Sequence, residues 1–172
     1  SKWRRTTSIP ENTGHIYFNA LAASKHMYIF GGNYMDPETK RPVAVPDVWR
    51  ASINADGSLG QWAKCSPLPK PRKFGSVVFV DGQLYYLGGQ YHRQVYHTTI
   101  KDDGSLAPWR ETRNLISNRF GFRTFHFNRH LYAVGGSILH NRRSDIVFRG
   151  KFADDGSVPK WRRSEPLPTP LG

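Results

Sequence analysis

The chain has 172 residues, 38% of them hydrophobic, and its 25 Lys and Arg outnumber its 13 Asp and Glu, giving a formal net charge of +12. This length is sufficient to bury a core as one domain. The sequence has no apolar run of about 18 residues, which excludes a membrane-spanning helix within it. Its single cysteine, Cys65, excludes an intrachain disulfide.

One short pattern occurs three times along the chain. Each copy is an Asp-Gly-Ser turn followed by an aliphatic residue and, three positions later, by a tryptophan: Trp62, Trp109 and Trp161. Each copy also contains a glycine pair after an apolar run: Gly31-Gly32, Gly88-Gly89 and Gly135-Gly136. Self-similarity with a period of about 50 residues predicts an array of supersecondary units.

In chain order, residues 1–10 carry only the end of the pattern, around Trp3, and predict the outer strand of a preceding unit. Three complete units follow, over residues 15–66, 73–113 and 120–165. Runs rich in Val, Ile, Tyr and Phe predict three strands in each unit, and the tryptophan lies in a fourth. The predicted first, second and third strands are 19–23, 27–30 and 48–53, then 76–80, 84–87 and 95–100, then 123–127, 131–134 and 146–152.

Turn signals separate these strands. Asp81-Gly82 joins the first two strands of its unit, and because such a turn needs positive φ, Asp-Gly predicts a tight hairpin. Ser24-Lys25 and Asn128-Arg129 occupy the same place in the other units. The Asp-Gly-Ser runs join the third strand to the fourth in the same way. No longer segment shows a 3.6-residue period, so we expect almost no helix.

Four antiparallel strands, a glycine pair after the second and a tryptophan in the fourth resemble the kelch repeat of β-propellers. The aromatic position of the third strand differs from the common kelch spacing and is held by Trp49, Tyr96 and Phe148. The resemblance implies an all-β fold of three complete blades plus the outer strand of a fourth, within a ring of six to seven. A ring needs about four blades or more, so we expect the remaining blades or a second copy to close it, and favour a segment of a longer propeller.

The repeating glycines and aspartates are interpreted as structural. The glycine pairs match no phosphate-binding pattern and no helix follows them. Asp56, Asp103 and Asp155 are expected to hold their turns, because each turn offers too few oxygens for calcium. We therefore predict no cofactor and no metal.

The strand order predicts one end of the blades as the binding face. In an antiparallel blade the loop between the second and third strands and the crossover to the next blade leave from the same end, where variable loops collect. Arginine there offers a bidentate fork to carboxylate, sulfate or phosphate, and tyrosine can stack on a sugar or base. The candidate binding residues are Tyr34, Lys40, Arg41, Arg72, Lys73, Tyr91, His92, Arg93, Arg119, His140, Arg142 and Arg143.

These residues and the net charge predict a non-catalytic binding or assembly module for an acidic glycan or an acidic protein. One alternative is a structural component of a virion or ribonucleoprotein, with a cationic rim at Arg4-Arg5 and Arg162-Arg163 against nucleic acid. Another is a carbohydrate-active kelch enzyme whose site is shared with further blades. No paired acid and base groups stand on the basic loops, so we assign no catalytic residue.

Overall fold

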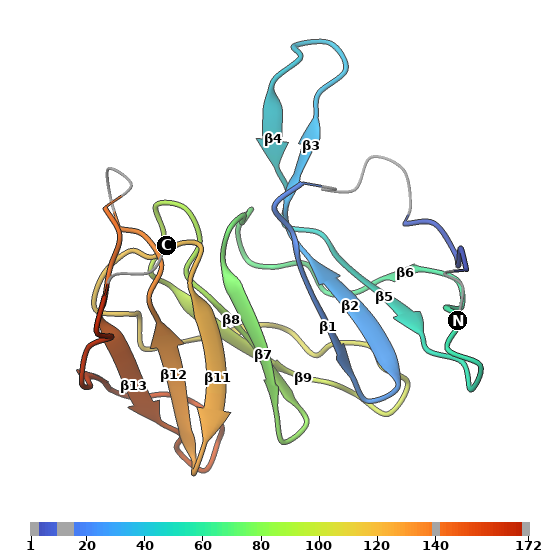
Figure 1. Cartoon of the computed structure of the whole chain (residues 1–172). Coiled ribbons are helices and arrows are strands. Elements are labelled where there is room, and N and C mark those ends of the chain that lie inside the picture. Colours follow the sequence, from blue (N-terminus) through green and yellow to red (C-terminus); the bar gives the residue numbers. More distant parts are fainter. Residues whose placement is uncertain (1–3, 10–15, 139–141, 170–172) are drawn as a thin grey trace.

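The computed structural model describes residues 4–9, 16–138 and 142–169 of the chain (Figure 1). All regular structure in these residues is β, as predicted, and none of them forms a helix of the length and apolar character that a membrane crossing requires. The strands are β1 (Asn19–Ala23), β2 (His26–Phe30), β3 (Asn33–Met35), β4 (Pro42–Ala44), β5 (Val48–Ser52), β6 (Ala63–Lys64), β7 (Ser76–Val80), β8 (Gln83–Leu87), β9 (Val95–Thr99), β10 (Arg110–Thr112), β11 (Arg123–Phe127), β12 (His130–Val134), β13 (Val147–Lys151) and β14 (Trp161–Arg163).

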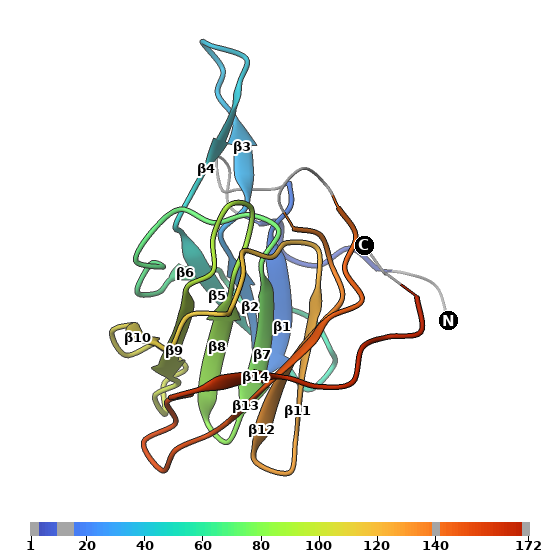
Figure 2. The same cartoon turned by 90° about the vertical axis from the view of Figure 1, so that its left-hand side faces the viewer.

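Twelve of these strands form three antiparallel four-stranded sheets, which we call blades 1, 2 and 3. Blade 1 has the order β1-β2-β5-β6, blade 2 β7-β8-β9-β10 and blade 3 β11-β12-β13-β14. The first strands of neighbouring blades contact one another, β1 with β7 and β7 with β11. Figures 1 and 2 show the three sheets side by side, with the longer loops at one end and the tight hairpins at the other.

The tight hairpins have the backbone that the turn signals predict. Asp81 and the glycine after it both have positive φ, and so do both members of Ser24-Lys25 and Asn128-Arg129. Such turns match the twist of the two strands that they join. The serine, lysine, asparagine and arginine residues therefore adopt a left-handed conformation that glycine would adopt at lower cost.

The structure differs from the expected elements at three places. Trp62 and Trp109 directly precede the fourth strands β6 and β10, in which they were predicted to lie, whereas Trp161 begins β14 as predicted. Residues 33–46 lie in the loop between the second and third strands of blade 1, where no strand was predicted, but β3 and β4 pair within them as a hairpin that projects from the blades (Figure 1). Residues 4–9 form no strand, and Trp3, around which the outer strand of a preceding blade was predicted, lies outside the described residues.

The core lies between the blades, where the apolar faces of adjacent sheets meet. The cluster between blades 1 and 2 contains Ala23, Tyr28, Phe30, Val48, Leu68, Leu84, Tyr86 and Leu106. The cluster between blades 2 and 3 contains Val80, Tyr85, Leu87, Val95, Leu115, Phe122, Leu131, Ala133, Phe148, Val158 and Trp161. Each blade therefore buries its apolar side chains against its neighbours, as stacked repeats do.

Candidate binding site

The repeated tryptophans fasten each blade to the segment before it. The indole N–H of Trp109 donates to the carbonyl of Ser66 at 3.0 Å, and that of Trp161 donates to the carbonyl of Arg113 at 2.8 Å. Each acceptor stands four residues after the preceding tryptophan. The tryptophans therefore occupy equivalent surroundings, as their recurrence predicts.

We call the contact region between two neighbouring blades a joint. The aliphatic residue of each Asp-Gly-Ser turn makes a second contact at these joints. The backbone N–H of Val158 donates to the hydroxyl of Thr112 at 2.7 Å, and that of Leu59 donates to the hydroxyl of Thr6 at 2.8 Å. Cys65 holds the equivalent place between blades 1 and 2, where burial raises the pKa of its thiol. Cys65 is half-buried, and a thiol with a raised pKa is a poor nucleophile.

Arg72 and Arg119, expected to present cations to a ligand, are buried, with exposed fractions of 1% and 0%. Arg72 donates to the hydroxyl of Tyr96 at 3.1 Å, and Arg119 donates to the carbonyl of Ile146 at 2.9 Å and lies 4.5 Å from the ring centre of Phe148. Burial lowers the pKa of both guanidinium groups, that of Arg119 to about 10. The expectation is corrected for these two residues, because their guanidinium groups bind the protein itself.

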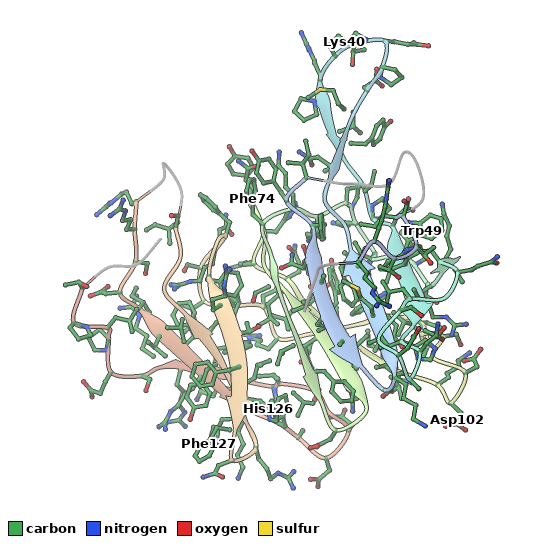
Figure 3. The ribbon with its side chains drawn as sticks, turned by 45° about the vertical axis from the view of Figure 1, so that its right-hand side comes forward. Lys40, Trp49, Phe74, Asp102, His126 and Phe127 are labelled. Carbon is green, nitrogen blue, oxygen red and sulfur yellow. The ribbon has the colours of Figure 1, made fainter. Side chains whose placement is uncertain are left out.

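The projecting hairpin carries three of the expected binding residues. Tyr34 is half-buried on β3, whereas Lys40 and Arg41 are exposed near the tip, where Figure 3 labels Lys40. Asp36 and Glu38 share this tip, and the Asp36 carboxylate accepts the backbone N–H of Glu38 at 3.0 Å. Two acidic residues balance two basic ones, so the tip has little net charge of its own.

The loop between β8 and β9 lies against the crossover that leads into blade 2. Burial is the main cause of the lowered pKa of His92, and the charges of Arg72 and Lys70 lower it further. Tyr91 is 66% exposed, and Lys73 is half-buried. The structure thus brings the expected residues of this loop and this crossover together.

Two of the expected residues of blade 3, Arg142 and Arg143, are exposed in the loop between β12 and β13. The third, His140, lies outside the described residues. The structure therefore places two cations of this loop at the surface.

A cleft lies between blades 2 and 3, and we call it the interblade cleft. Its volume is about 570 Å³. Leu115 and Trp161 are the buried apolar residues of its lining, and the buried Oδ1 of Asn114 has no hydrogen-bond partner among the described residues. The lining residues are Arg93, Thr112, Arg113, Asn114, Leu115, Ile116, Lys160 and Trp161.

Three cations and no carboxylate line this cleft, and the repeat does not require them. The carbonyls of Pro46, Arg93 and Asp145 hold equivalent places, since each accepts a 2.8 Å hydrogen bond from the leucine six residues after a tryptophan. Arg113 lies four residues after its tryptophan, and Lys160 lies one residue before the next one. Between blades 1 and 2 these two positions are held by Ser66 and Pro108. Of the three equivalent sets of positions, only the set between blades 2 and 3 is basic.

The cations of the interblade cleft have no carboxylate partner within the described part of the chain. The ion pairs between side chains of the described residues are Arg50–Asp103, Lys64–Asp47 and Arg129–Asp154, and none of them involves a residue of the cleft. Of the three cleft cations, sequence reasoning selected only Arg93. Comparing the repeats position by position would have found Arg113 and Lys160, because they are cations where the equivalent residues of the other complete units are neutral or acidic.

Among the described residues, no group of three or more His, Cys, Asp or Glu side chains converges as metal ligands would. The Asp-Gly-Ser aspartates instead accept hydrogen bonds inside their own turns, such as the backbone N–H of Ser105 on Asp103 at 2.8 Å. These hydrogen bonds lower the pKa of the Asp103 carboxyl.

No protein-family model matches the chain. It is 23% identical over 145 residues to kelch-like protein 41 of Mus musculus, a match covering 83% of this chain and 23% of that protein. It is 26% identical over 159 residues to an F-box/kelch-repeat protein of Arabidopsis thaliana, covering 87% of this chain and 38% of that protein. It is 27% identical over 128 residues to spermatocyte protein spe-26 of Caenorhabditis elegans, covering 70% and 21%. The chain thus spans between about a fifth and two fifths of these relatives.

Among solved structures, that of YjhT superposes with a TM-score of 0.77 at 14% sequence identity. The match covers 98% of this chain and 57% of the YjhT chain. At this identity the likeness concerns the fold, and it extends over all three blades.

Proposed function

The chain is a run of kelch-type β-propeller repeats, and from this premise we propose that it binds an acidic segment of a partner protein in the interblade cleft, without catalysis. The gathering of Arg93, Arg113 and Lys160 at one joint carries this proposal. The repeat leaves these three positions free of charge between blades 1 and 2. Three cations that pair with no carboxylate of the described residues favour an anionic ligand around this cleft, since arginine binds carboxylates through a fork of N–H groups.

The other residues that line the interblade cleft favour a peptide as the molecule that carries the carboxylates. Ile116 offers exposed apolar surface for a side chain, next to the buried Leu115 and Trp161. The buried amide oxygen of Asn114 has no hydrogen-bond partner among the described residues, and a peptide N–H that reached it would satisfy it. Apolar surface with a few convergent polar groups is the usual composition of a binding pocket.

Poly-glutamate tests the proposal directly, with a heparin-type polysaccharide as the second probe. Binding of poly-glutamate, measured by fluorescence anisotropy, is expected to weaken steeply as NaCl rises, because exposed charges are screened. The double variant Arg93→Ala/Lys160→Ala is expected to reduce the affinity by about tenfold.

The matched control is Lys101→Ala/Lys151→Ala, which removes the same charge from exposed residues outside the cleft. Equal losses in both double variants would show a response to net charge alone and contradict the cleft. Binding of the polysaccharide without binding of poly-glutamate would assign the cleft to a glycan instead.

A further inference from the structure

Two aromatic residues hold the same unusual backbone conformation at the loop end of neighbouring blades. Tyr17 and Phe74 each stand two residues before the first strand of their blade, and their φ angles are +60° and +58°. The equivalent residue of blade 3 is Gly121, with a φ of +64°. The fold therefore requires a left-handed backbone at this position in all three blades.

Glycine is the residue that this backbone favours, and blades 1 and 2 have aromatic residues instead. A bulky side chain at positive φ is an outlier, whereas glycine adopts this conformation at little cost. Gly121 shows that glycine meets the structural requirement, so the strain at Tyr17 and Phe74 is not needed for folding. Strained residues of this kind cluster at ligand-binding sites. The two aromatic side chains are therefore the feature of this position that calls for a function.

Backbone hydrogen bonds hold the aromatic residues beside one another. The N–H of Phe74 donates to the carbonyl of Tyr17 at 3.2 Å, and that of Gly121 donates to the carbonyl of Phe74 at 3.0 Å. The ring centres of Tyr17 and Phe74 are 4.1 Å apart, and the ring of Phe120 follows at 6.2 Å from that of Phe74. We call Tyr17, Phe74 and Phe120 the aromatic ledge. Figure 3 labels Phe74 at the end of the blades from which the hairpin of β3 and β4 projects.

The aromatic ledge is open to solvent and has a cation beside it. Tyr17 is 52% exposed, and Phe74 and Phe120 are half-buried. The Nζ of Lys73 lies 5.9 Å from the ring centre of Phe74. Aromatic rings pair in offset or edge-to-face arrangements with centres about 4.5–7 Å apart. A ring from a ligand can therefore extend the row beside Tyr17, and Lys73 can pair with a carboxylate next to that ring.

The loop between β8 and β9 connects the aromatic ledge to the interblade cleft. The N–H of Gln90 donates to the carbonyl of Lys73 at 3.0 Å, and the carbonyl of Arg93 accepts the N–H of Leu115 at 2.8 Å. Tyr91 stands between these two points and is 66% exposed. The chain from Gln90 to Arg93 spans at most about 11 Å. An extended segment of about four or five residues can therefore reach from the cleft to the ledge.

We propose that the aromatic ledge binds an aromatic side chain of the same acidic segment that the interblade cleft binds. This inference rests on the proposed function, and it adds to the partner an aromatic residue about four or five positions from its carboxylates. Bases of a nucleic acid stack on aromatic rings as well, but a stacked strand needs a groove of cations along its backbone. Here three cations gather in the cleft, at one end of the path, which favours a peptide.

Two acidic copolymers of equal length and equal glutamate content test the proposal, one of glutamate with tyrosine and one of glutamate with alanine. They compare ligands with and without rings at constant charge. In fluorescence anisotropy the wild type is expected to bind the glutamate–tyrosine copolymer about tenfold more tightly. Both affinities fall as NaCl rises, but the preference is expected to persist, because ring packing is not screened as charges are.

Tyr17→Gly/Phe74→Gly gives blades 1 and 2 the residue that blade 3 has at this position. The double variant is expected to stay folded, since glycine adopts positive φ without strain, and to bind both copolymers equally. Tyr17→Gly alone removes the exposed ring and is expected to reduce the preference. The matched control is Ser24→Gly/Asn128→Gly, which makes the same backbone change at the hairpin end, at φ +47° and +45°, and keeps the preference. Circular dichroism checks that each variant is folded.

Arg93→Ala/Lys160→Ala separates the aromatic ledge from the interblade cleft, because it is expected to weaken both copolymers by the same factor and to keep the preference. Equal binding of the two copolymers by the wild type, or a preference that survives Tyr17→Gly/Phe74→Gly, overturns the ledge and leaves the cleft standing. A wild type that binds neither copolymer overturns the proposed function and this inference with it. Tighter binding of single-stranded poly-uridine, lost in the double glycine variant, assigns the ledge to nucleic acid and also overturns the inference.

Discussion

The hydroxyl of Tyr85 in blade 2 donates a 2.7 Å hydrogen bond to the carbonyl oxygen of Gly156 in blade 3. The same bond joins Tyr28 in blade 1 to Gly104 in blade 2. Burial raises the pKa of both phenols, that of Tyr28 to about 12. A buried hydroxyl thus links blade 1 to the Asp-Gly-Ser turn of blade 2, and blade 2 to that of blade 3.

Replacing Tyr85 with phenylalanine is expected to lower the free energy of unfolding by about 1–2 kcal/mol, because the Gly156 carbonyl loses its partner in a buried site. Urea denaturation followed by tryptophan fluorescence measures the loss. Tyr132→Phe removes the equivalent hydroxyl of blade 3, which makes no interblade bond to the described residues, and is expected to change the free energy of unfolding by less than about 0.5 kcal/mol. Equal losses in the two variants would contradict the role of the interblade bond.

Alkaline pH is expected to destabilise the fold. Burial is the first cause of the raised pKa of Tyr28, Tyr85, Tyr86 and Tyr96, so the folded chain holds phenolic protons that the unfolded chain releases near pH 10. The stability that these protonated phenols contribute is fully present below about pH 10, and it is lost as the pH rises toward 12 and beyond. Thermal unfolding midpoints between pH 8 and pH 11.5 measure this, and a constant midpoint would refute it.

Gly88→Ala is expected to destabilise the chain strongly. Gly88 has a φ of +59°, and a methyl group there would lie 2.7 Å from the carbonyl oxygen of Arg119. Gly57→Ala is the matched control, because Gly57 has a φ of +81° and open space around it. The control is expected to cost about 1 kcal/mol of conformational strain, and Gly88→Ala at least about 3 kcal/mol. Similar costs in denaturant unfolding would argue against a close approach of backbone at the glycine pair.

Arg119→Ala is expected to destabilise the chain, whereas replacing an exposed arginine is not. Its guanidinium donates to the carbonyl of Ile146 at 2.9 Å and to the hydroxyl of Ser144 at 3.3 Å, and both acceptors lose a partner in the variant. The expected loss is about 3 kcal/mol in urea unfolding. Arg142→Ala, at an exposed residue, is expected to stay within about 0.5 kcal/mol of the wild type. A small effect of Arg119→Ala would return this residue to the candidate ligand-binding set.

The sequence by itself determined the first three strands of each blade and their order, although not the projecting hairpin of β3 and β4. The first strands predicted at 19–23, 76–80 and 123–127 have these bounds in the structure, and the hairpin turns have the positive φ that they require. Both results are local, because strand period and turn backbone depend on residues that are close in the chain. The repeat also predicted that Trp62, Trp109 and Trp161 would share one environment, since equal residues at equal spacing meet equal neighbours.

Only the tertiary structure decided what the basic residues do. Arg72 and Arg93 are both cations in predicted loops, yet Arg72 is inserted beside Tyr96 of the next blade whereas Arg93 faces the interblade cleft. Lys160 reaches the same cleft from a position 67 residues further along the chain than Arg93. The direction of a side chain and its distant neighbours are set by the packing of one blade on another, which involves contacts that no local pattern records.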